Sequence, residues 1–553
     1  MNTAVVGTAP PQLNLRVNVE PLRGSQLIRD YYDAAPALAP FFAGSPWDRN
    51  AWQRVAGDVR VYFDQARLRA MPPAIHAGTP AARARLQRIA AGEGFFVQTG
   101  QQAGLFGGPL YTIHKILTTV RLAQKLEAEL GVPVAPLFWI AADDHDFAEV
   151  NHAFVLTEQH DLVNLQLHDD GRPPASMQNR PLGAQVEELL SELARCLPAN
   201  ESSDEILAAL RASYTPNTTV AQAFGKLVAF LFDRFDLLIT SSADPHVKRL
   251  AAPLLQRELA NAEAHEDAVN AQTQKLVSLG YHEQVPVRSD AANVSYEDEH
   301  GRDRLMRAGS DWELSRSKQR LSHTEMDNLL AQEPLRFSAN ALLRPVVASA
   351  VFPTLAYVGG PAEVSYFAQI GCLFAAHGVP MPLVVPRAGV EIIEYKVQKV
   401  LDKFRLQPPD VHVPYDRLVT RVVRSELPAE ITDTLEKLRA QLTDGYGKLV
   451  EAAIQIDPTL QGPLESARNA GHKMLSDMDK KIVRHLKRRN AIELEQLRRA
   501  HTNLFPNGQP QERVVGILSY YGRYGPAILD TIADEIGFTF DATAPAWTGV
   551  MCR

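Results

Sequence analysis

Residues 95–141 combine two short apolar runs with one long amphipathic stretch. The first run, 95–97, is followed at once by a glycine-bearing loop, as expected for a buried strand that ends in a turn. Apolar residues then recur every three or four positions over 111–130, which predicts a helix, and Gly131 ends it. A second apolar run covers 134–141. We therefore predict a strand–helix–strand unit with two parallel strands.

Further apolar runs at 237–240, 352–358 and 381–385 predict more strands, and helical stretches separate them. Strands that alternate with helices favour an α/β fold with a mostly parallel sheet covered by helices. Two insertions interrupt this pattern. The first, about 165–225, is expected to be largely helical. The second, about 280–320, alternates around a turn-rich segment and is expected to contain a hairpin.

Charged helical sequence dominates the chain after about residue 390. Two amphipathic stretches, one around 435–449 and one over about 465–502, flank a break at Asp457–Pro458. This pattern predicts an antiparallel helical hairpin or a coiled coil. The predicted division is a core over residues 1–388, which begins with about 90 mostly helical residues, and a second domain over 389–553. The terminal segment of the second domain is expected to fold back on the core.

The bulk composition narrows the range of functions. A chain of 553 residues is too long for one compact core. Its net charge of -7 argues against a surface built mainly to bind nucleic acid, which needs an excess of Lys and Arg. Cys196, Cys372 and Cys552 are too far apart to form a CxxC pair. We find no signal peptide within residues 1–11 and no apolar stretch that could span a membrane, so we expect a cytoplasmic protein.

The loop over 99–109 follows the first predicted strand, and ligands of open α/β sheets bind beyond the carboxyl ends of the strands. Its glycines let backbone N–H groups approach a ligand, and the N-terminus of the next helix favours an anion. The alternative is a tight turn, which needs the glycines but not the two glutamines. The loop matches neither the Walker A nor the GxGxxG pattern. Its candidate binding residues are Thr99, Gly100, Gln101, Gln102 and Gly104.

Tyr111, His114 and Lys115 lie in the first turns of the helix that follows this loop. His114 is three residues after Tyr111, so the two side chains can share one helix face. A histidine and a lysine at this place can stabilise phosphate charge during activation by a nucleotide. The alternative is that both are ordinary residues of a helix surface.

An acidic cluster ends the second predicted strand. Asp143, Asp144, His145 and Asp146 follow the apolar run directly, and Asn151 comes shortly after them. Carboxylates at the end of a buried strand are costly unless they are solvated, paired or bound to a ligand. They can bind Mg²⁺ through phosphate, or accept a proton from an attacking amine. Their spacing does not match a zinc site, so we assign no residue as a metal ligand of that kind.

A third strand-end loop follows the apolar run at 352–358. Glu363 comes early in the next predicted helix, where it either recognises a substrate amine or only stabilises the helix N-terminus. Arg344, upstream, is a candidate clamp for a carboxylate. The other candidates near this loop are Tyr357, Gly359, Gly360 and Tyr366.

The segment 504–513 is polar and rich in turn-forming residues, which predicts a sharp reversal toward the core. It is either only a loop or, with Arg387, part of a second pocket between the core and the coiled coil. The candidate residues in the segment are Asn507, Gln511 and Arg513.

The chain resembles the BshC family, the cysteine-adding enzymes of bacillithiol biosynthesis. The likeness rests on five segments in the same order, and residues 165–225 and the last fifteen residues match least. The segments are TGQQAGLFGGPLYTIHK (99–115), PLFWIAADDHDFAEVNH (136–152), LLRPVV (342–347), YVGGPAEVSYFAQ (357–369) and LFPNGQPQER (504–513).

This resemblance implies a Rossmann-like core related to nucleotidyltransferases, inserted subdomains, and a C-terminal coiled coil that pairs two chains into a homodimer. It also implies a ligase that joins the carboxyl group of cysteine to the amino group of glucosaminyl-malate. An activating cosubstrate is then expected, with ATP (and ADP) as the natural nucleotides and Mg²⁺ as a further candidate. The rival hypotheses are a ligase with a different amine acceptor and a nucleotide-binding dimeric scaffold without turnover.

Roles follow from this hypothesis. The loop of Gly100, Gln101 and Gly104, with His114 and Lys115, is expected to hold the activating group. Asp144 and Asp146 are expected to bind metal or deprotonate the amine, with His145 also in the catalytic set. Arg344 and Glu363 are expected to orient malate and amino groups. The candidates for a nucleotide site near the coiled coil are Arg387, Asn507, Gln511 and Arg513.

Overall fold

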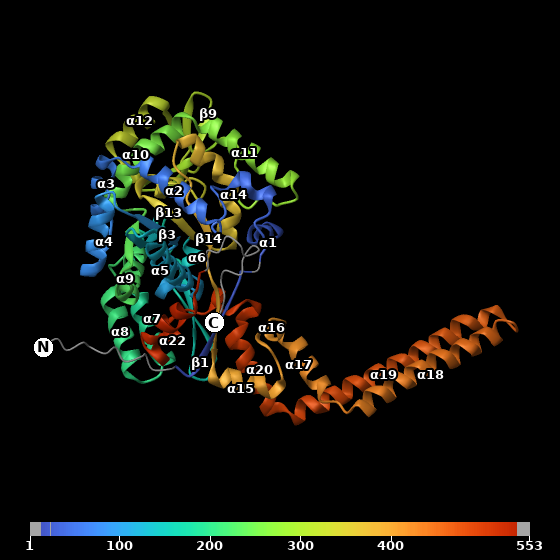
Figure 1. The fold of residues 1–553 in the computed structure, drawn as a ribbon. Helices are drawn as coiled ribbons and strands as arrows, with labels where there is room; N and C mark the ends of the chain where they lie inside the picture. The colour runs from blue at the N-terminus through green and yellow to red at the C-terminus, as the bar shows by residue number, and fades with distance from the viewer. Residues whose placement is uncertain (1–12, 23, 539–553) are drawn as a thin grey trace. The chain divides into compact units, whose positions relative to one another are not determined.

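The computed structural model describes residues 13–22 and 24–538. They form two compact units (Figure 1). Of the described residues, the first unit holds 13–22, 24–158, 162–392 and 512–538, and the second holds 159–161 and 393–511. The sequence placed this division between 388 and 389, whereas the structure places it after Ile392. Cys552 and the segment 1–11 lie outside the described residues.

A six-stranded sheet forms the centre of the first unit, in the order β14-β13-β3-β4-β7-β2. Every pairing is parallel except that of the short edge strand β2 with β7. This confirms the predicted α/β fold with a mostly parallel sheet. The strands are β2 (His76–Ala77), β3 (Phe95–Gln101), β4 (Val134–Ile140), β7 (Leu238–Ser241), β13 (Thr354–Gly359) and β14 (Leu383–Pro386).

The strand order reverses direction between β3 and β13. From β3 the chain moves outward through β4 to β7, and it then returns to the other side of β3 with β13 and β14. This reversal is a topological switch point, where the loops after two adjacent strands diverge and leave a crevice. The carboxyl ends of β3 and β13 are therefore the place in this sheet where a ligand is expected.

Both faces of the sheet are covered, as β4 shows most clearly. All seven of its residues are buried. Leu137 and Trp139 belong to one apolar core, whereas Phe138 and Ile140 belong to another on the opposite face. Each fully buried side chain of this size contributes about 1.5–3 kcal/mol to folding. The helices next to the central strands are α5 (Leu110–Leu130), which ends at left-handed Gly131, and α14 (Pro361–His377).

The two insertions take the forms that the sequence suggested. A β5–β6 hairpin is followed by three helices, and a separate antiparallel sheet has the order β11-β10-β9-β8-β12. The elements are β5 (His152–Leu156), β6 (Leu162–Gln166), α7 (Gln185–Cys196), α8 (Glu201–Ser213), α9 (Val220–Phe232), β8 (Ala291–Asp298), β9 (Gly301–Ala308), β10 (Asp311–Leu314), β11 (Arg320–Ser322) and β12 (Phe337–Ala339). Helices α10 (Pro245–Ala260), α11 (Ala262–Ser278) and α12 (His323–Gln332) accompany the antiparallel sheet.

The N-terminal region contains two strands, β1 and the short β2 of the central sheet, where helix was predicted. Strand β1 (Leu15–Glu20) pairs with β15 (Gly389–Glu394). Its partner lies far along the chain, and such a pairing leaves no local signal in the sequence. The rest of the region is mainly helical, with α1 (Gln26–Tyr32), α2 (Arg49–Tyr62), α3 (Gln65–Ala70) and α4 (Pro80–Ala90).

The second unit is helical. Helices α18 (Ala429–Ala453) and α19 (Gln461–Arg489) form the expected hairpin and lie side by side in Figure 1. The second predicted helix is divided, because α19 ends at Arg489 and α20 (Ala491–Leu504) follows. The other helices are α15 (Tyr395–Phe404), α16 (Pro408–Val411) and α17 (Tyr415–Ser425).

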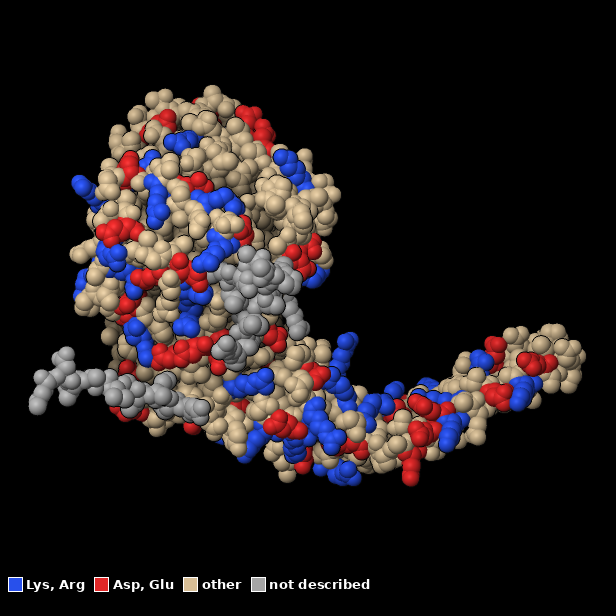
Figure 2. All heavy atoms as spheres, viewed as in Figure 1, with Lys and Arg blue, Asp and Glu red and all other residues tan. Residues whose placement is uncertain are grey.

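Charged side chains of both signs are mixed over the face shown in Figure 2, without one large basic area. Among the described residues, no helix is both long and apolar enough to cross a membrane.

Candidate active site

A cavity of about 570 Å³ lies at the switch point. Its lining includes Gly100 and Gln101 at the end of β3, Gly360 after β13, and Asp144 after β4. Residues of α10, β8, β9 and β12 complete its wall, so the antiparallel sheet forms part of the same cavity. The first unit alone supplies every lining residue.

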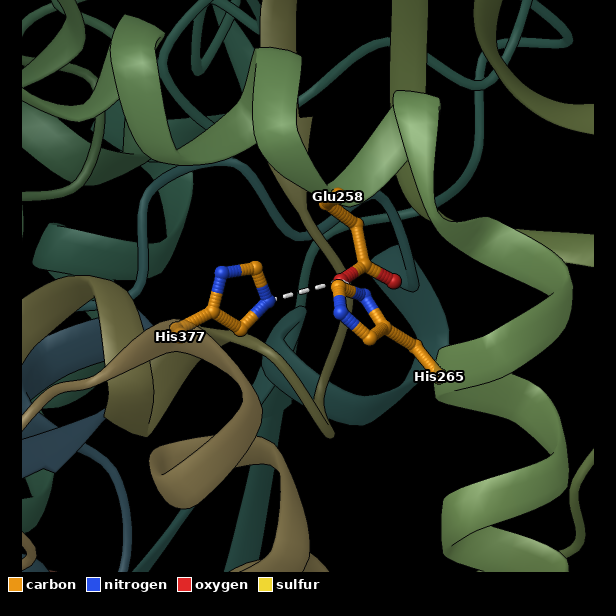
Figure 3. A group of neighbouring side chains, drawn as sticks. All are labelled: Glu258, His265 and His377. Carbon is orange, nitrogen blue, oxygen red and sulfur yellow. Dashed lines mark hydrogen bonds and ion pairs between the residues drawn. The ribbon is translucent and has the colours of Figure 1, made fainter.

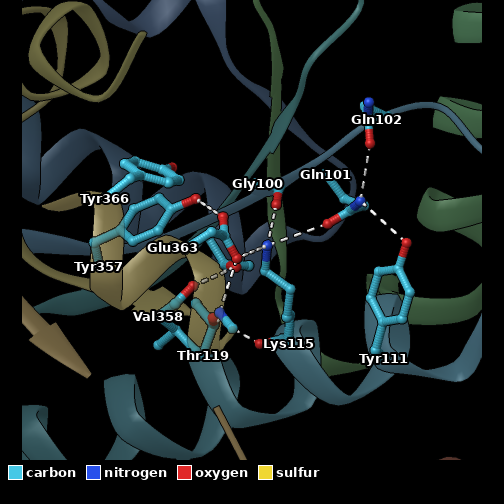
Figure 4. Close-up of polar contacts among 12 residues, drawn as sticks. Gly100, Gln101, Gln102, Tyr111, Lys115, Thr119, Tyr357, Val358, Glu363 and Tyr366 are labelled. Carbon is cyan, nitrogen blue, oxygen red and sulfur yellow. Dashed lines mark hydrogen bonds and ion pairs between the residues drawn. The ribbon is translucent and has the colours of Figure 1, made fainter. Parts of the chain in front are cut away.

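An ion pair between Lys115 and Glu363 joins the two strand ends at this point (Figure 4). The Lys115 Nζ donates to Gly100 O at 2.5 Å, to Glu363 Oε2 at 2.6 Å and to Gln101 Oε1 at 3.2 Å. An ammonium group has three N–H donors, so this set of acceptors uses all of them. Lys115 therefore holds the end of β3 and Glu363 in place, and none of its donors is left for a ligand.

Glu363 is equally occupied. Its Oε1 accepts the Tyr357 hydroxyl at 2.6 Å, and its Oε2 accepts the backbone N–H of Gly360 at 2.8 Å as well as Lys115. Burial opposes its ionisation, but Lys115 and Arg344 outweigh burial and lower the pKa of Glu363 below its usual value. Burial also lowers the pKa of Lys115, which the adjacent Glu363 partly offsets. The second alternative for Glu363 thus holds, because it stabilises the start of α14, and its charge also lies at the cavity.

Arg344 explains why residue 100 is glycine. It begins α13 (Arg344–Val351), and its Nη2 donates to the Tyr366 hydroxyl at 2.8 Å. A Cβ on Gly100 would lie 3.1 Å from Arg344 Nη1 and 3.0 Å from Trp139 O. A side chain at residue 100 would therefore push the guanidinium away from the cavity wall.

The acidic cluster divides into residues at the cavity and residues away from it. Asp144 lines the cavity, and its Oδ2 accepts Gln102 Nε2 at 2.6 Å. Asp143 also lines it and pairs with Lys248 at 2.6 Å. Asp146 is exposed, caps α6 (Phe147–Val150) through the Glu149 N–H, and does not line the cavity. Of the two carboxylates expected to bind metal or deprotonate the amine, only Asp144 therefore lines the cavity.

The segment 103–109 serves packing and not anion binding. The N–H groups of Gly104, Gly107, Gly108 and Leu110 all donate to backbone carbonyls. A Cβ on Gly104 would lie 2.8 Å from Gly108 Cα, so the glycines allow the loop to close on itself. These N–H groups are therefore not available to a phosphate, and of the loop residues only Gly100, Gln101 and Gln102 line the cavity.

His114 is buried behind the cavity and does not line it. Its Nδ1 lies 3.2 Å from Glu512 Oε2, and Arg387 binds the same carboxylate with two hydrogen bonds of 2.6 and 2.7 Å. Burial lowers the pKa of His114, whereas Arg387 and His114 lower that of Glu512 despite its burial. His114 thus positions Glu512 and Arg387, and only Arg387 reaches the cavity.

Comparisons with known proteins agree with this architecture. The family model described as "Bacillithiol biosynthesis BshC, N-terminal Rossmann-like domain" matches residues 13–388, and the model of the BshC C-terminal coiled-coil domain matches 390–539. The chain belongs to the BshC family. The BshC protein of Salinibacter ruber is 34% identical and that of Koribacter versatilis 32%, over 81% and 83% of this chain and 82% and 85% of theirs. The Bacillus cereus protein is 28% identical, and all three carry a cysteine-ligase name.

The remaining predicted site residues of this BshC chain divide into those that line the cavity and those that do not. Thr99 donates to Val358 O and joins β3 to β13, and Asn151 donates to Leu167 O. Neither lines the cavity, and His145, Tyr357, Gly359 and Tyr366 do not line it either. Tyr111 and Arg513 do. Arg387 and Arg513 line the cavity of the first unit, whereas Asn507 and Gln511 belong to the second unit. The expected nucleotide site that groups them stays a prediction.

Sequence reasoning missed the residues that the antiparallel sheet and α10 contribute. These are mostly cationic or amide side chains, and the list is Lys248, Arg288, Asn293, Arg302 and Arg304. Arg302 and Arg304 are two residues apart on β9, so their side chains lie on one face of the strand. No pattern along the chain showed that this face lies opposite the ends of β3 and β13.

A buried cluster of Glu258, His265 and His377 lies outside the cavity lining (Figure 3). Glu258 Oε2 is 2.6 Å from His265 Nδ1 and 2.8 Å from His377 Nε2, and Oε1 accepts Asn293 Nδ2 at 2.7 Å. These are hydrogen-bond distances that satisfy the carboxylate without an ion. The cluster joins α10, α11 and α14, and Asn293 connects it to the cavity wall.

Proposed function

We propose that this BshC protein is a cytoplasmic ligase that joins the carboxyl group of cysteine to the amino group of glucosaminyl-malate. The observation that carries the proposal is the cavity at the switch point, which combines a charged wall with the sequence segments that carry the family resemblance. The names of the relatives support a cysteine ligase. The identity of the acceptor and the way in which the carboxyl group is activated go beyond these names and are part of the proposal.

Activation of the cysteine carboxyl group is required because amide formation from a free carboxylate is unfavourable in water. We propose ATP as the cosubstrate, which when bound supplies a phosphate-activated carboxyl group. The donor set fits a phosphate-bearing ligand, since Arg513 reaches the cavity and has no carboxylate partner among the described residues. Arg513 would bind the phosphates, next to Arg387, whose charge Glu512 already balances. A role of Asp144 as a carboxylate ligand of Mg²⁺ is the alternative to its role as the base.

Asp144 is also the residue that we propose as the base. The attacking amine must lose a proton, and a carboxylate that lines the cavity and is only partly buried can accept it. Gln102 orients the Asp144 carboxylate through its 2.6 Å hydrogen bond. Lys115 and Glu363 act as positioning residues, because each already has a full set of partners.

The test is product formation by the full-length chain with cysteine, glucosaminyl-malate, ATP and Mg²⁺. Mass spectrometry should detect the sum of the two substrates less one water. Asp144→Ala should reduce the rate about 100- to 10,000-fold, as expected for loss of a general base. Asp58→Ala, an exposed aspartate in α2, is the matched control and should keep the wild-type rate. Nucleotide binding without any product would favour a scaffold, and product only with another amine would identify a different acceptor.

A further inference from the structure

The cavity has an excess of positive charge. Eight lysine and arginine side chains line it, against four aspartates and glutamates. Three of the cations have a carboxylate partner: Lys115 pairs with Glu363, Lys248 with Asp143, and Arg387 with Glu512. The unpaired positive charge therefore lies elsewhere in the lining.

Much of it lies on the antiparallel sheet. Arg302 and Arg304 are two residues apart on β9 and point to the same face, and Arg288 precedes β8. Arg302 is held by neutral groups, with Nε on Ser338 Oγ at 2.9 Å and Nη2 on Ala339 O at 3.2 Å. Among the described residues, no acceptor is within hydrogen-bond distance of the Arg288 or Arg304 guanidinium.

The neighbouring carboxylates are used by other groups. Asp303 accepts the backbone N–H groups of Arg304, Arg316 and Ser317. Glu266, which also lines the cavity, pairs with Arg307 and not with Arg304. Burial, followed by repulsion from Arg288 and Arg302, lowers the pKa of Arg304. Asp303 offsets part of this effect, but among the described residues none of the three guanidinium groups on this wall forms a salt bridge with a carboxylate.

We propose that Arg288, Arg302 and Arg304 bind the malate dicarboxylate of the acceptor, a proposal that rests on the proposed function. Arginine donors suit a planar carboxylate, which they can bind with two parallel hydrogen bonds. Two carboxylates would supply two negative charges to this wall of three guanidinium groups. The same chemistry would also suit phosphate. We favour the dicarboxylate because a phosphate has another unpaired cation in the cavity, Arg513, which lies outside the antiparallel sheet.

The experiment compares two acceptors in the full-length protein, glucosaminyl-malate and a methyl glucosaminide without carboxylates. For wild type, kcat/KM should favour the malate acceptor. Arg304→Gln and Arg288→Gln should each reduce this preference by roughly 10- to 100-fold, the range for one charge-assisted contact. Neither should raise the KM for ATP or cysteine. Arg320→Gln, on β11 and paired with Glu313 outside the cavity, is the matched control and should leave the preference unchanged.

Calorimetric binding of glucosaminyl-malate and of ATP separates failure of this inference from failure of the proposed function. If glucosaminyl-malate binds wild type but not Arg304→Gln, and neither protein turns it over, the arginine site is supported and the ligase activity is contradicted. Turnover with an unchanged preference in both variants would overturn the arginine site alone. A higher KM for ATP in the variants, with the acceptor KM unchanged, would assign the arginines to phosphate and also overturn it. Absence of both glucosaminyl-malate binding and turnover in wild type would overturn both proposals.

Discussion

At the residue scale, the cavity depends on charged side chains that bind each other before they bind any ligand. Lys115 and Glu363 are buried, and each satisfies the other together with the ends of β3 and β13. Such a pair contributes little net stability compared with apolar residues, but removal of one partner leaves the other charge buried and unpaired. The pair therefore determines the geometry of the switch point more than the stability of the protein.

Lys115→Met should destabilise the first unit by about 3–5 kcal/mol, because it leaves the Glu363 carboxylate without its cation. Lys115→Met combined with Glu363→Gln should recover a large part of this loss, since the second substitution removes the unpaired charge. Urea unfolding followed by tryptophan fluorescence measures both values. Equal instability of the single and double variants would show that the ion pair does not account for the cost.

The Glu258 cluster predicts a dependence of stability on acid pH. Its histidines and Asn293 lower the pKa of Glu258 from 4.5 to about 2, although burial opposes this. A pKa that is lower in the folded state means stability that is present above pH 4.5 and is lost as the pH falls toward 2. The shift corresponds to about 3 kcal/mol. Glu258→Gln should remove this part of the acid dependence, measured as the unfolding midpoint between pH 5 and 2.5; a wild-type slope in the variant would contradict it.

At the element scale, the helical hairpin of α18 and α19 leaves apolar side chains in solvent. Met474 is 66% exposed and Met478 is 49% exposed, and their spacing of four residues puts them on one face of α19. Leu438 and Leu449 of α18 are exposed to a similar degree. Helix faces of this kind are typical of surfaces that a second helix covers. They support the proposal that the hairpin pairs two chains.

Met474→Glu combined with Met478→Glu should convert a dimer into a monomer, because four glutamates would meet at the interface. Sedimentation velocity of the full-length chain measures the mass. Lys473→Glu, also exposed on α19, is a matched change on the same helix and should leave the dimer intact. A wild-type protein that sediments as a monomer at micromolar concentration would contradict the proposal.

At the scale of the whole molecule, the sequence predicts single strands and helices but not the contacts between elements that are far apart in the chain. Strands β3 and β4 and helix α5 were predictable, because apolar runs and helical spacing reflect burial directly. Gly100, Gln101 and Asp144 followed from their places at strand ends. Arg304 did not, because its role depends on how a separate sheet packs against the switch point. The sequence pattern of segment 103–109 is ambiguous, because glycines that allow close packing cannot be told from glycines that bind phosphate.

The role of the whole protein can be tested in its own cell by deletion of its gene. Deletion of the gene should abolish bacillithiol and cause glucosaminyl-malate to accumulate, because no enzyme would join cysteine to its amino group. The wild-type gene should restore the thiol, whereas an Asp144→Ala gene should not, and the Asp58→Ala gene should act as wild type. Mass spectrometry of thiol extracts measures both compounds. Unchanged bacillithiol in the deletion strain, with no second copy of such a gene, would contradict the ligase and favour a scaffold that binds nucleotide through the same cavity.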